Sequence, residues 1–593
     1  MYKKSDKLRR FLAILTLFCL FSLSAAEGQD SLLSDLDMGK TSYSWLSVLS
    51  GSGLGKPVKS SYGWVEVTEG KMVCAWTESG KVLWQKGLPA SASSLLSVDP
   101  DDFSAVILRN KKLCLLNPSG LVLWQKPLSF EALHPPLFGR DGRIFVFGKD
   151  KAACFGMNGI QKWEEKFEAI SSRLPPAALD DGSVAVFLEA LSDNKSQAVR
   201  ISPFGENLER IVFASKVSAA LSVRAGLLLA FDDKSAGLCS ADKSGGKSEW
   251  VIKGLSIGEN PRLLSLEPEG LAALVSSAAT GTSVCVINVQ KGAAEKAFLA
   301  PDIKNIKEAF SCPDGIFLAA PDFGALYSLS GKRIRGAIFP PKTKKFNWDN
   351  VLYAKNGSVL LTSKNWSLAG WRLVKAAAER KPLKPRRLGY ENFYKDEPLD
   401  FFSAKEGSSV SRKEELEKGG YGKKERDFLL SSQAILDSWF IKNMSKNSVG
   451  GAIGSLSNDE LFSFSLSDET AAISMLGLFG TAGQAKTLSR ILTQAKDESV
   501  LIPALKAVQD FGYDPEGLLL DALELLAKNS NPSREALLGE LCSSLYSLCR
   551  FMGRSALSKK GLKILQTLQL PQYSNSTKEE ARNVYEKLAK LKM

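Results

Sequence analysis

The feature that most constrains the fold is a repeat of about 40 residues in the first third of the chain. Three stretches align closely, and Cys74, Cys114 and Cys154 stand 40 residues apart within them. Their sequences are KMVCAWTESGKVLWQK at 71–86, KLCLLNPSGLVLWQK at 112–126 and AACFGMNGIQKW at 152–163. A fixed period of this length indicates a repeat architecture rather than a single globular core.

Each copy contains a turn glycine followed four residues later by tryptophan. Ser-Gly and Asn-Gly pairs suit a turn that needs positive φ, which glycine adopts at the least steric cost. The pairs are Gly80 and Trp84, Gly120 and Trp124, Gly159 and Trp163, and Gly246 and Trp250. We expect each tryptophan to begin the return strand of a hairpin.

A second landmark, a turn glycine before an apolar run, precedes these pairs by about 17 residues. It occurs at Gly63, Gly142 and Gly182, more weakly at Gly226, Gly270, Gly315 and Gly357, and is replaced by Asp102-Phe103 in the second unit. About 40 residues suffice for four short strands and their turns, the content of one propeller blade. We therefore predict a closed eight-bladed β-propeller over residues 57–375. Residues 41–56 or the last strand would supply the missing edge of the terminal blade.

At these residues the chain resembles the PQQ-type (pyrroloquinoline-quinone-type) β-propeller repeat. The closest fits to its consensus are Lys81-Val-Leu-Trp84 after Gly80, and Asp141-Gly-Arg-Ile-Phe-Val. The resemblance implies that Trp84, Trp124, Trp163 and Trp250 dock neighbouring blades. Other units have Glu209, Lys296 and Arg335 at this position, which leaves their docking open. Family members without catalytic groups are scaffold proteins of the bacterial envelope, and the outer-membrane assembly lipoprotein of this fold is the nearest architectural analogue.

The resemblance also raises the question of a quinone cofactor. Quinoprotein dehydrogenases of this class present a vicinal Cys-Cys pair to the quinone and bind calcium through Glu, Asn and Asp. This sequence has no adjacent cysteines, so we predict no cofactor. The turn Asp99-Pro-Asp-Asp102 could hold calcium, but a hairpin tip is the simpler interpretation. One histidine and no C-x-x-C pair argue against a zinc site.

Two apparent catalytic motifs are incomplete. GLSIG at 254–258 matches the G-x-S-x-G nucleophile motif, which needs a strand–turn–helix setting and a later histidine, but the only histidine is His134. Residues 51–56 resemble a phosphate loop, but Ser50 and Pro57 replace its first glycine and its magnesium-binding hydroxyl residue. The sequence therefore predicts no catalytic, cofactor-binding or metal-binding residues and a protein that is not an enzyme.

Residues 1–26 have the three regions of a secretory signal peptide: a basic start, an apolar run and small residues before a cleavage site after Ala26. Lipidation at Cys19 is disfavoured because Phe18 is bulky where lipoprotein processing needs a small residue. Export to the periplasm or cell envelope argues against nucleic acid as a partner. Without residues 1–26 the formal charge falls from +13 to +9, because five basic residues and one acidic residue are removed. A net positive charge of this size is explained by solubility alone. It also suits binding to acidic proteins or peripheral association with anionic membrane or envelope surfaces.

Eight cysteines remain after Cys19. Those at the repeat position are expected to be small buried apolar residues. Cys542 and Cys549 are seven residues apart on one predicted helix, about 10.5 Å along its axis, which excludes a disulfide between them. We expect free thiols for most.

The pattern changes after Trp371. Residues 27–56 form a lead-in to the repeats, and residues 376–425 read as a basic, polar linker. From 426 to 593 apolar residues recur at helical spacing, which resembles a HEAT-type helical repeat domain. Predicted N-caps are Asp468, Asp514 and Ser533, with Pro515 at a first helical position, and predicted closing glycines are Gly480, Gly512 and Gly553. Few contacts are expected between this array and the propeller.

Two functions remain open from the sequence. The first is an exported, non-catalytic scaffold whose propeller and helical array bind protein partners. The second is a propeller enzyme or sensor that acts on a small molecule or glycan at the central channel. Convergent acids in a pocket would favour the second function, and a broad apolar or basic groove the first. The oligomeric state is left open.

Overall fold

The fold is described from a computed structural model of the chain. It describes residues 45–48, 53–69, 71–139, 141–189, 195–224, 226–240, 248–266, 270–339, 348–354, 357–363, 367–372, 432, 435–436, 466–479 and 482–590. The predicted signal peptide, Cys19 and the linker lie outside these residues. Two compact units are present, the first within Met1–Pro57, Tyr62–Gln85 and Gly254–Pro382, and the second within Val58–Ser61, Lys86–Lys253 and Leu383–Met593.

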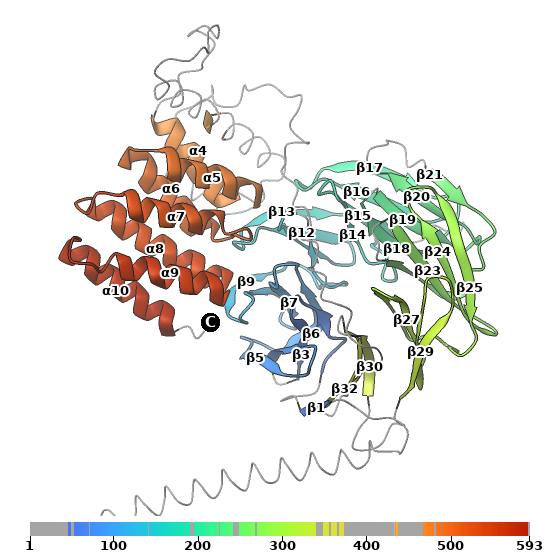
Figure 1. The fold of residues 1–593 in the computed structure, drawn as a ribbon. Coiled ribbons are helices and arrows are strands. Elements are labelled where there is room, and N and C mark those ends of the chain that lie inside the picture. Colours follow the sequence, from blue (N-terminus) through green and yellow to red (C-terminus); the bar gives the residue numbers. More distant parts are fainter. Residues whose placement is uncertain are drawn as a thin grey trace, which may run out of the picture. The chain divides into compact units, whose positions relative to one another are not determined.

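The described strands form four-stranded antiparallel sheets, the blades of a β-propeller (Figure 1). Blade 1 contains β2 (Val58–Lys59), β3 (Gly63–Thr68), β4 (Met72–Thr77) and β5 (Val82–Gly87). Blade 2 contains β6 (Ala92–Val98), β7 (Ser104–Leu108), β8 (Lys112–Leu116) and β9 (Val122–Pro127). Blade 3 contains β10 (Leu137–Phe138), β11 (Ile144–Phe147), β12 (Lys151–Phe155) and β13 (Gln161–Lys166). Blade 4 contains β14 (Ala177–Ala178), β15 (Val184–Leu188), β16 (Gln197–Ile201) and β17 (Asn207–Val212).

The later blades follow the same order. Blade 5 contains β18 (Val217–Val223), β19 (Gly226–Phe231), β20 (Ala236–Ser240) and β21 (Ser248–Ile252). Blade 6 contains β22 (Glu259–Ser265), β23 (Leu271–Ala278), β24 (Gly281–Asn288) and β25 (Ala293–Ala300). Blade 7 contains β26 (Glu308–Cys312), β27 (Gly315–Ala319), β28 (Phe323–Tyr327) and β29 (Arg333–Ile338). The terminal sheet contains β30 (Trp348–Tyr353), β31 (Ser358–Ser363), β32 (Ser367–Arg372) and β1 (Trp45–Val48).

The prediction of eight equivalent blades from residues 57–375 needs correction. Seven complete blades are built there from four consecutive strands each, β2 to β29. The last repeat supplies only β30–β32, and its sheet is completed by β1 from before the repeats. Leu46 pairs with Ala369 in this antiparallel ladder, so residues 41–56 do supply the missing edge strand. A repeat pattern reveals turns and apolar runs, but not which strand completes a sheet.

Burial explains why the repeat sequences form these strands. The second strand of a blade is covered on both faces and reads as a continuous apolar run, as in β7 and β15, which are buried throughout. The outermost strand is exposed and mixed, as in β25. All eight cysteines of the described residues are buried and free, as predicted for most of them. Burial raises the pKa of Cys74 and Cys114 to about 12, so both are unreactive thiols.

The predicted tryptophan docking is confirmed for two blades. Trp124 Nε1 donates to Met157 O in blade 3, and Trp163 Nε1 donates to Pro203 O in blade 4, at 2.7 and 2.9 Å. The turn glycine of the next blade makes room for the ring: a Cβ on Gly159, where φ is +80°, would lie 2.8 Å from Trp124 Cδ2. The glycine therefore permits both the turn and the close approach of the ring.

Phe298 takes the tryptophan's place in blade 6, where the repeat position is Lys296. A Cβ on Gly331 of the next blade would lie 2.7 Å from the Cβ and Cγ of Phe298. Its ring also stacks on Tyr327 at 5.9 Å between centroids. An aromatic side chain two residues later in the strand thus performs the docking that the repeat pattern left open.

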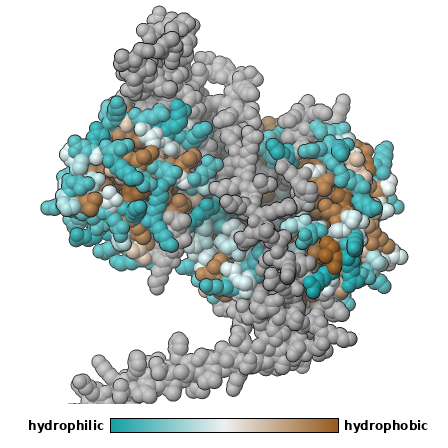
Figure 2. Space-filling model, in the orientation of Figure 1, coloured by the Kyte–Doolittle hydropathy of each residue, from teal (hydrophilic) through white to brown (hydrophobic). Residues whose placement is uncertain are grey.

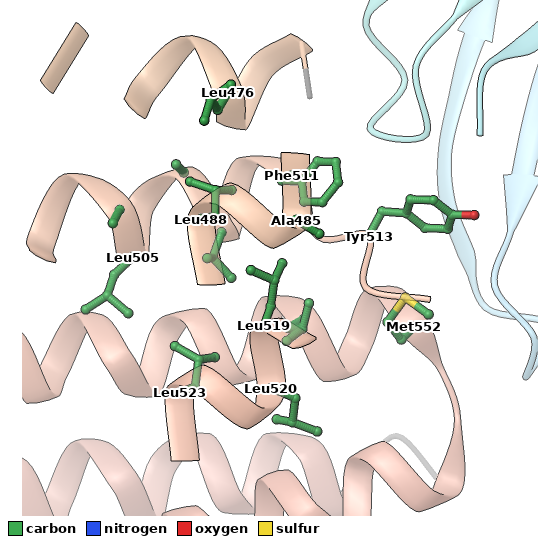
Figure 3. Close-up of a cluster of buried hydrophobic side chains, with 14 of the residues drawn as sticks. Leu476, Ala485, Leu488, Leu505, Phe511, Tyr513, Leu519, Leu520, Leu523 and Met552 are labelled. Carbon is green, nitrogen blue, oxygen red and sulfur yellow. The ribbon is translucent and has the colours of Figure 1, made fainter. Parts of the chain in front are cut away.

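The helices of the second unit form two layers. They are α4 (Leu466–Phe479), α5 (Ala482–Gln494), α6 (Glu498–Phe511), α7 (Leu518–Asn529), α8 (Glu535–Met552), α9 (Ser555–Thr567) and α10 (Asn575–Lys590). α4, α6, α8 and α10 pack in sequence in one layer, and α5, α7 and α9 in the other (Figure 1). Each layer buries aliphatic side chains of its neighbour, among them Leu505, Leu519 and Leu523 (Figure 3). The predicted helical region is confirmed.

The helix boundaries agree only in part with the sequence signals. Gly512 and Gly553 end α6 and α8 in the left-handed conformation, as predicted, whereas Gly480 lies outside the described residues. Asp514 does accept from the α7 backbone, at Leu520 N, but α7 begins at Leu518, so Pro515 lies in the preceding turn. The residue before α8 is Arg534 rather than Ser533. α4 begins before Asp468, at Leu466.

The expectation of few contacts between array and propeller is wrong. One hydrophobic cluster contains buried residues of blades 2 and 3, such as Phe103 and Phe155, together with residues of the helices, such as Leu505 and Leu541. Ile435 and Leu436 also belong to it. The contacts are made by blade turns and helix ends. The sequence signals at these places predict where strands and helices end, but not what the ends contact.

Candidate functional site

Helices α6 and α8 end against the turns of blade 2, within the second unit. The side-chain amide of Asn117, in the β8–β9 turn, donates to Arg550 O in the last turn of α8 at 2.8 Å. Carbonyls in the last turn of a helix lack partners within the helix and carry the negative end of its dipole. Asn117 therefore satisfies a carbonyl that the helix itself leaves open.

The same side chain also holds its own turn. Asn117 Oδ1 accepts from the backbone of Ser119 and Leu121. Gly553, directly after α8, touches Asn117 so closely that an added Cβ would lie 2.4 Å from Nδ2. With φ at +59°, Gly553 thus ends the helix and allows the blade turn to approach.

The acidic turn at residues 99–102 is the second contact. Arg554 forms an ion pair with Asp101, with Nη2 and Oδ1 2.8 Å apart, and Tyr513 donates to Asp101 Oδ2 at 3.2 Å. The other two carboxylates of this turn bind backbone and hydroxyl groups of the propeller: Asp99 accepts from Phe103 N, and Asp102 from Ser61. The acidic turn therefore contacts the helical array through Asp101.

Aromatic rings fill the space between these polar contacts. Phe103 of blade 2 is fully buried and lies 5.7 Å from the ring of Tyr513 and 5.6 Å from that of Phe551. Figure 3 shows Tyr513 leaving the helical layers and pointing toward the blade strands. Aromatic contacts at such distances add to the stabilisation from burial alone.

Blade 3 binds the end of α4 in the same way. Asn158 Nδ2 and Lys162 Nζ both donate to Leu478 O, at 2.9 and 3.3 Å. Lys162 is buried, and its charge is favourably placed at a helix C-terminus. A cavity of about 10 Å³ lies beside these residues and is lined in part by Gly142, Phe511 and Tyr513, which leaves room for about one water molecule.

A buried ion pair positions the adjacent turn of blade 3. Arg143 Nε lies 2.9 Å from Asp141 Oδ2, and both side chains are almost fully buried. Arg143 also donates to Pro203 O at 2.8 Å and lies over the Phe204 ring. This network connects blades 3 and 4 and lines the same small cavity as Asn158 and Lys162.

The structure does not assemble the apparent catalytic motifs. Ser256 lies in the connection between β21 and β22, and the motif lacks its strand–turn–helix setting. His134 is buried with Nε2 2.7 Å from Ser171 O. Lys56, from the partial phosphate loop, pairs with Glu308. Across the described ranges no group of three or more His, Cys, Asp or Glu residues is placed to hold a metal ion. None of the described helices is long and apolar enough to cross a membrane.

Sequence reasoning missed Asn117, Asn158 and Lys162. The position three residues before the turn glycine carries Thr77, Ser202 and Ser328 in other blades, whose hydroxyls accept bonds from their own turns. Among these residues only Asn117 has amide donors left for a second element. An amide at a position that carries a hydroxyl residue in three other blades is the signal that could have identified Asn117.

Comparison with known proteins supports the repeat assignment. Residues 69–203 match the family model described as outer membrane protein assembly factor BamB. A search of curated proteins finds no match.

Several solved structures are similar over a little more than half of the chain. BamB from Moraxella catarrhalis is 15% identical, with 56% of this chain and 99% of that chain covered and a TM-score of 0.41. For the computationally designed Ika8 protein the identity is 11%, the coverage 55% and 98%, and the TM-score 0.39. A streptogramin B lyase is 14% identical, with 56% and 98% covered and a TM-score of 0.34. By the family model, residues 69–203 of this chain are similar to the PQQ-type propeller family described as outer membrane protein assembly factor BamB.

Proposed function

We propose that this protein is an exported, non-catalytic scaffold of the periplasm or cell envelope that binds protein partners through its propeller and its helical array. The docked interface carries the proposal. Asn117, Asn158 and Asp101 bind helix ends, so two repeat modules of the second unit share one packed core. Repeat modules of both kinds typically recognise proteins over broad surfaces.

Two further observations support this function. The family model that matches residues 69–203 is described as an outer-membrane protein assembly factor, which suggests partners from an envelope assembly machinery. Exposed aliphatic side chains lie on the outermost strands of blades, where Leu208 and Val212 of β17 are 44% and 55% exposed. Figure 2 shows hydrophobic residues interspersed among hydrophilic ones on the visible surface. In this proposal the two-layer array is of the HEAT type.

Capture of partners by the full chain from its native envelope tests the proposal. We expect a near-stoichiometric protein partner for the unaltered chain and its loss on combining Leu208→Lys with Val212→Lys. The control is Leu570→Lys, because Leu570 is also 44% exposed but lies outside the blades. Failure to recover any stoichiometric protein, or substrate turnover by the purified chain, would contradict the scaffold function.

A further inference from the structure

The end of blade 2 at the β7–β8 turn carries a patch of positive charge. It consists of four residues from this turn, the start of β8 and the end of β9: Arg109, Lys111, Lys112 and Lys126. We call them the basic patch. The first two are exposed and the other two are half-buried. Backbone pairing brings the segments together, because Lys112 pairs with Pro127, directly after Lys126.

No acidic side chain of the described residues compensates the basic patch. The sequence contains no aspartate or glutamate between Asp102 and Glu131. The Nε atom of Arg109 donates to a backbone carbonyl, that of Ala92, at 3.2 Å. Across the part of the chain that the structure describes, none of the four side chains forms an ion pair. Four like charges at one end of a sheet repel one another, so a bound anion would stabilise this surface.

The acidic residues of blade 2 lie at its other end. Asp99, Asp101 and Asp102 precede β7, whereas the basic patch follows it, so the five residues of this strand, about 17 Å, separate the two groups. The acidic end is occupied, since Asp101 pairs with Arg554 of the helical array. The charge of this blade is therefore separated along its strands, and its positive end lies away from the docked interface.

The neighbouring blade is neutral at the same end. Blade 3 has as many basic as acidic residues around its β11–β12 turn and in the last part of β13: Lys149, Lys151 and Lys166 against Asp150, Glu164 and Glu165. Lys151 and Glu164 form an ion pair at 3.1 Å. The excess of positive charge is thus a property of blade 2 and not of every blade end.

The composition of the basic patch favours a membrane surface over a protein partner. Protein interfaces are built around aromatic and large aliphatic anchors and are depleted in lysine. Among the described residues, none of the exposed large hydrophobic side chains lies between Leu83 and Leu208. A lipid surface needs no such anchor, because its phosphates attract any lysine or arginine within about 10 Å at about 0.1 M salt.

We propose that the basic patch binds the phosphate head groups of an anionic membrane surface. The three lysine side chains are long and rotatable, so they can follow phosphates whose spacing is not fixed. Arg109 can bind one phosphate through its two terminal nitrogens. The binding is peripheral and electrostatic, and it compensates the like charges of the patch without insertion of apolar groups. This inference goes beyond the proposed function, which concerns protein partners at other residues.

Flotation with lipid vesicles tests the proposal. The chain used starts at residue 27, its predicted mature form, because the apolar run within residues 1–26 would itself enter lipid. One set of vesicles is phosphatidylcholine, and the other contains about 30 mol% of the anionic lipid phosphatidylglycerol. We expect binding only to the anionic vesicles, and its loss when salt is raised from about 0.1 M to about 1 M, which shortens the screening length from about 10 Å to about 3 Å. Equal binding to both vesicles, or binding that survives the higher salt, would overturn the proposal.

Removal of two patch charges locates the binding. Lys111→Gln combined with Lys126→Gln should lower the vesicle partition coefficient about 25-fold, because each lysine near an anionic membrane contributes a factor of about five. Lys111→Gln alone, at an exposed turn position, should lower it about fivefold, which decides the matter if the double variant fails to fold.

The matched control is Lys506→Gln combined with Lys528→Gln. It removes the same charge from exposed helix lysines that form ion pairs of their own. The control should change the partition coefficient less than about twofold, because these lysines are compensated. Equal losses in the two double variants would mean that only net charge matters, and no loss in either would place the lipid contact elsewhere in the chain. Both results would refute the basic patch as the membrane site.

Soluble competitors distinguish a membrane from other anions. Inorganic phosphate at about 10 mM, and polyglutamate at the same total charge as the vesicles, should each displace less than about half of the bound chain when ionic strength is matched with sodium chloride. Displacement by phosphate would make the patch a site for a free anion. Displacement by polyglutamate would make it a site for an acidic protein, and either result would overturn membrane binding.

Discussion

Single residues in this protein serve two elements at once. Asn117 holds a blade turn through its oxygen and a helix end through its nitrogen. Gly553 ends α8 in the left-handed conformation and leaves space for Asn117. Asn117 and Gly553 each contribute to a local turn and to the docked interface. Substitutions at these two positions should therefore affect both.

Gly553→Ala should therefore destabilise the second unit more than Gly517→Ala. Both glycines have positive φ, so both substitutions incur backbone strain of about 1 kcal/mol. Only at Gly553 would the new Cβ overlap another side chain, at 2.4 Å from Asn117; at Gly517 its nearest neighbour is 4.0 Å away. Thermal unfolding should show the larger decrease in Tm for Gly553→Ala. Equal decreases would mean that Asn117 moves away without loss.

Glu66 makes stability depend on pH. Its pKa is raised by burial from 4.5 to about 8, so the folded state binds a proton that the unfolded state releases between these values. The stabilisation is complete below pH 4.5 and is lost as pH rises through 8, with a slope of about 1.4 kcal/mol per pH unit.

Glu66→Gln should remove this component. Urea midpoints followed by tryptophan fluorescence at pH 5 and pH 8 should differ less for Glu66→Gln than for the unaltered chain. Trp64 and Trp76, stacked at 5.0 Å in the same blade, report on the region. The exposed control Glu295→Gln should retain the full difference. An unchanged pH slope in Glu66→Gln would show that Glu66 is ionised in the folded protein.

At the scale of elements, the sequence predicted individual hairpins and helices better than their contacts. Glycine followed by tryptophan predicts a hairpin because the turn and the ring both require that spacing. Gly512 and Gly553 predict helix ends because each adopts a positive φ directly after a helix. The interface could not be predicted this way, since Asn117 and Arg550 are 433 residues apart. Glu66 likewise reads as one polar residue in a strand, and only the fold shows that it is buried.

The aromatic contact of blade 2 with the helices should hold the array in place after the chain is cut. With a specific protease site inserted between residues 376 and 425, the two pieces of the unaltered chain should co-elute in gel filtration. Phe103→Ala should release the helical piece, because truncation of a fully buried phenylalanine costs about 3–5 kcal/mol and removes the contacts to Tyr513 and Phe551.

Phe231→Ala is the matched control for that experiment. Phe231 is also a buried propeller phenylalanine with an aromatic neighbour, Phe213 at 5.9 Å, but it belongs to a separate hydrophobic cluster that contains no helix residue. The two pieces of the cut Phe231→Ala chain should remain together even if blade 5 is destabilised. Release by both variants would indicate general unfolding, and release by neither would show that the polar contacts are sufficient.

At the scale of the whole chain, sequence order and spatial order differ at the ends of the repeat region. β1 precedes the first blade but completes the terminal sheet, which joins residues more than 300 positions apart. Blade 1 also packs on that sheet, where Trp64 and Trp76 share a cluster with Leu352 and Leu360. β1 cannot pair with β32 until all the repeats have been synthesised. We also expect this pairing to form late in folding, since contacts between distant residues form slowly.

Removal of β1 should expose the edge of β32. Two deletions that both begin at residue 27 isolate the contribution of β1. Deletion of residues 27–44 keeps β1, and deletion of residues 27–48 removes it. Without β1, backbone groups of residues 367–370 lose their partners, and an unpaired edge favours association with other chains. Hydrogen exchange at residues 367–370 should become faster only in the longer deletion, which should also form concentration-dependent oligomers in gel filtration. Equal protection of β32 in both variants would show that β1 contributes little to the terminal sheet, which would then be stable with three strands.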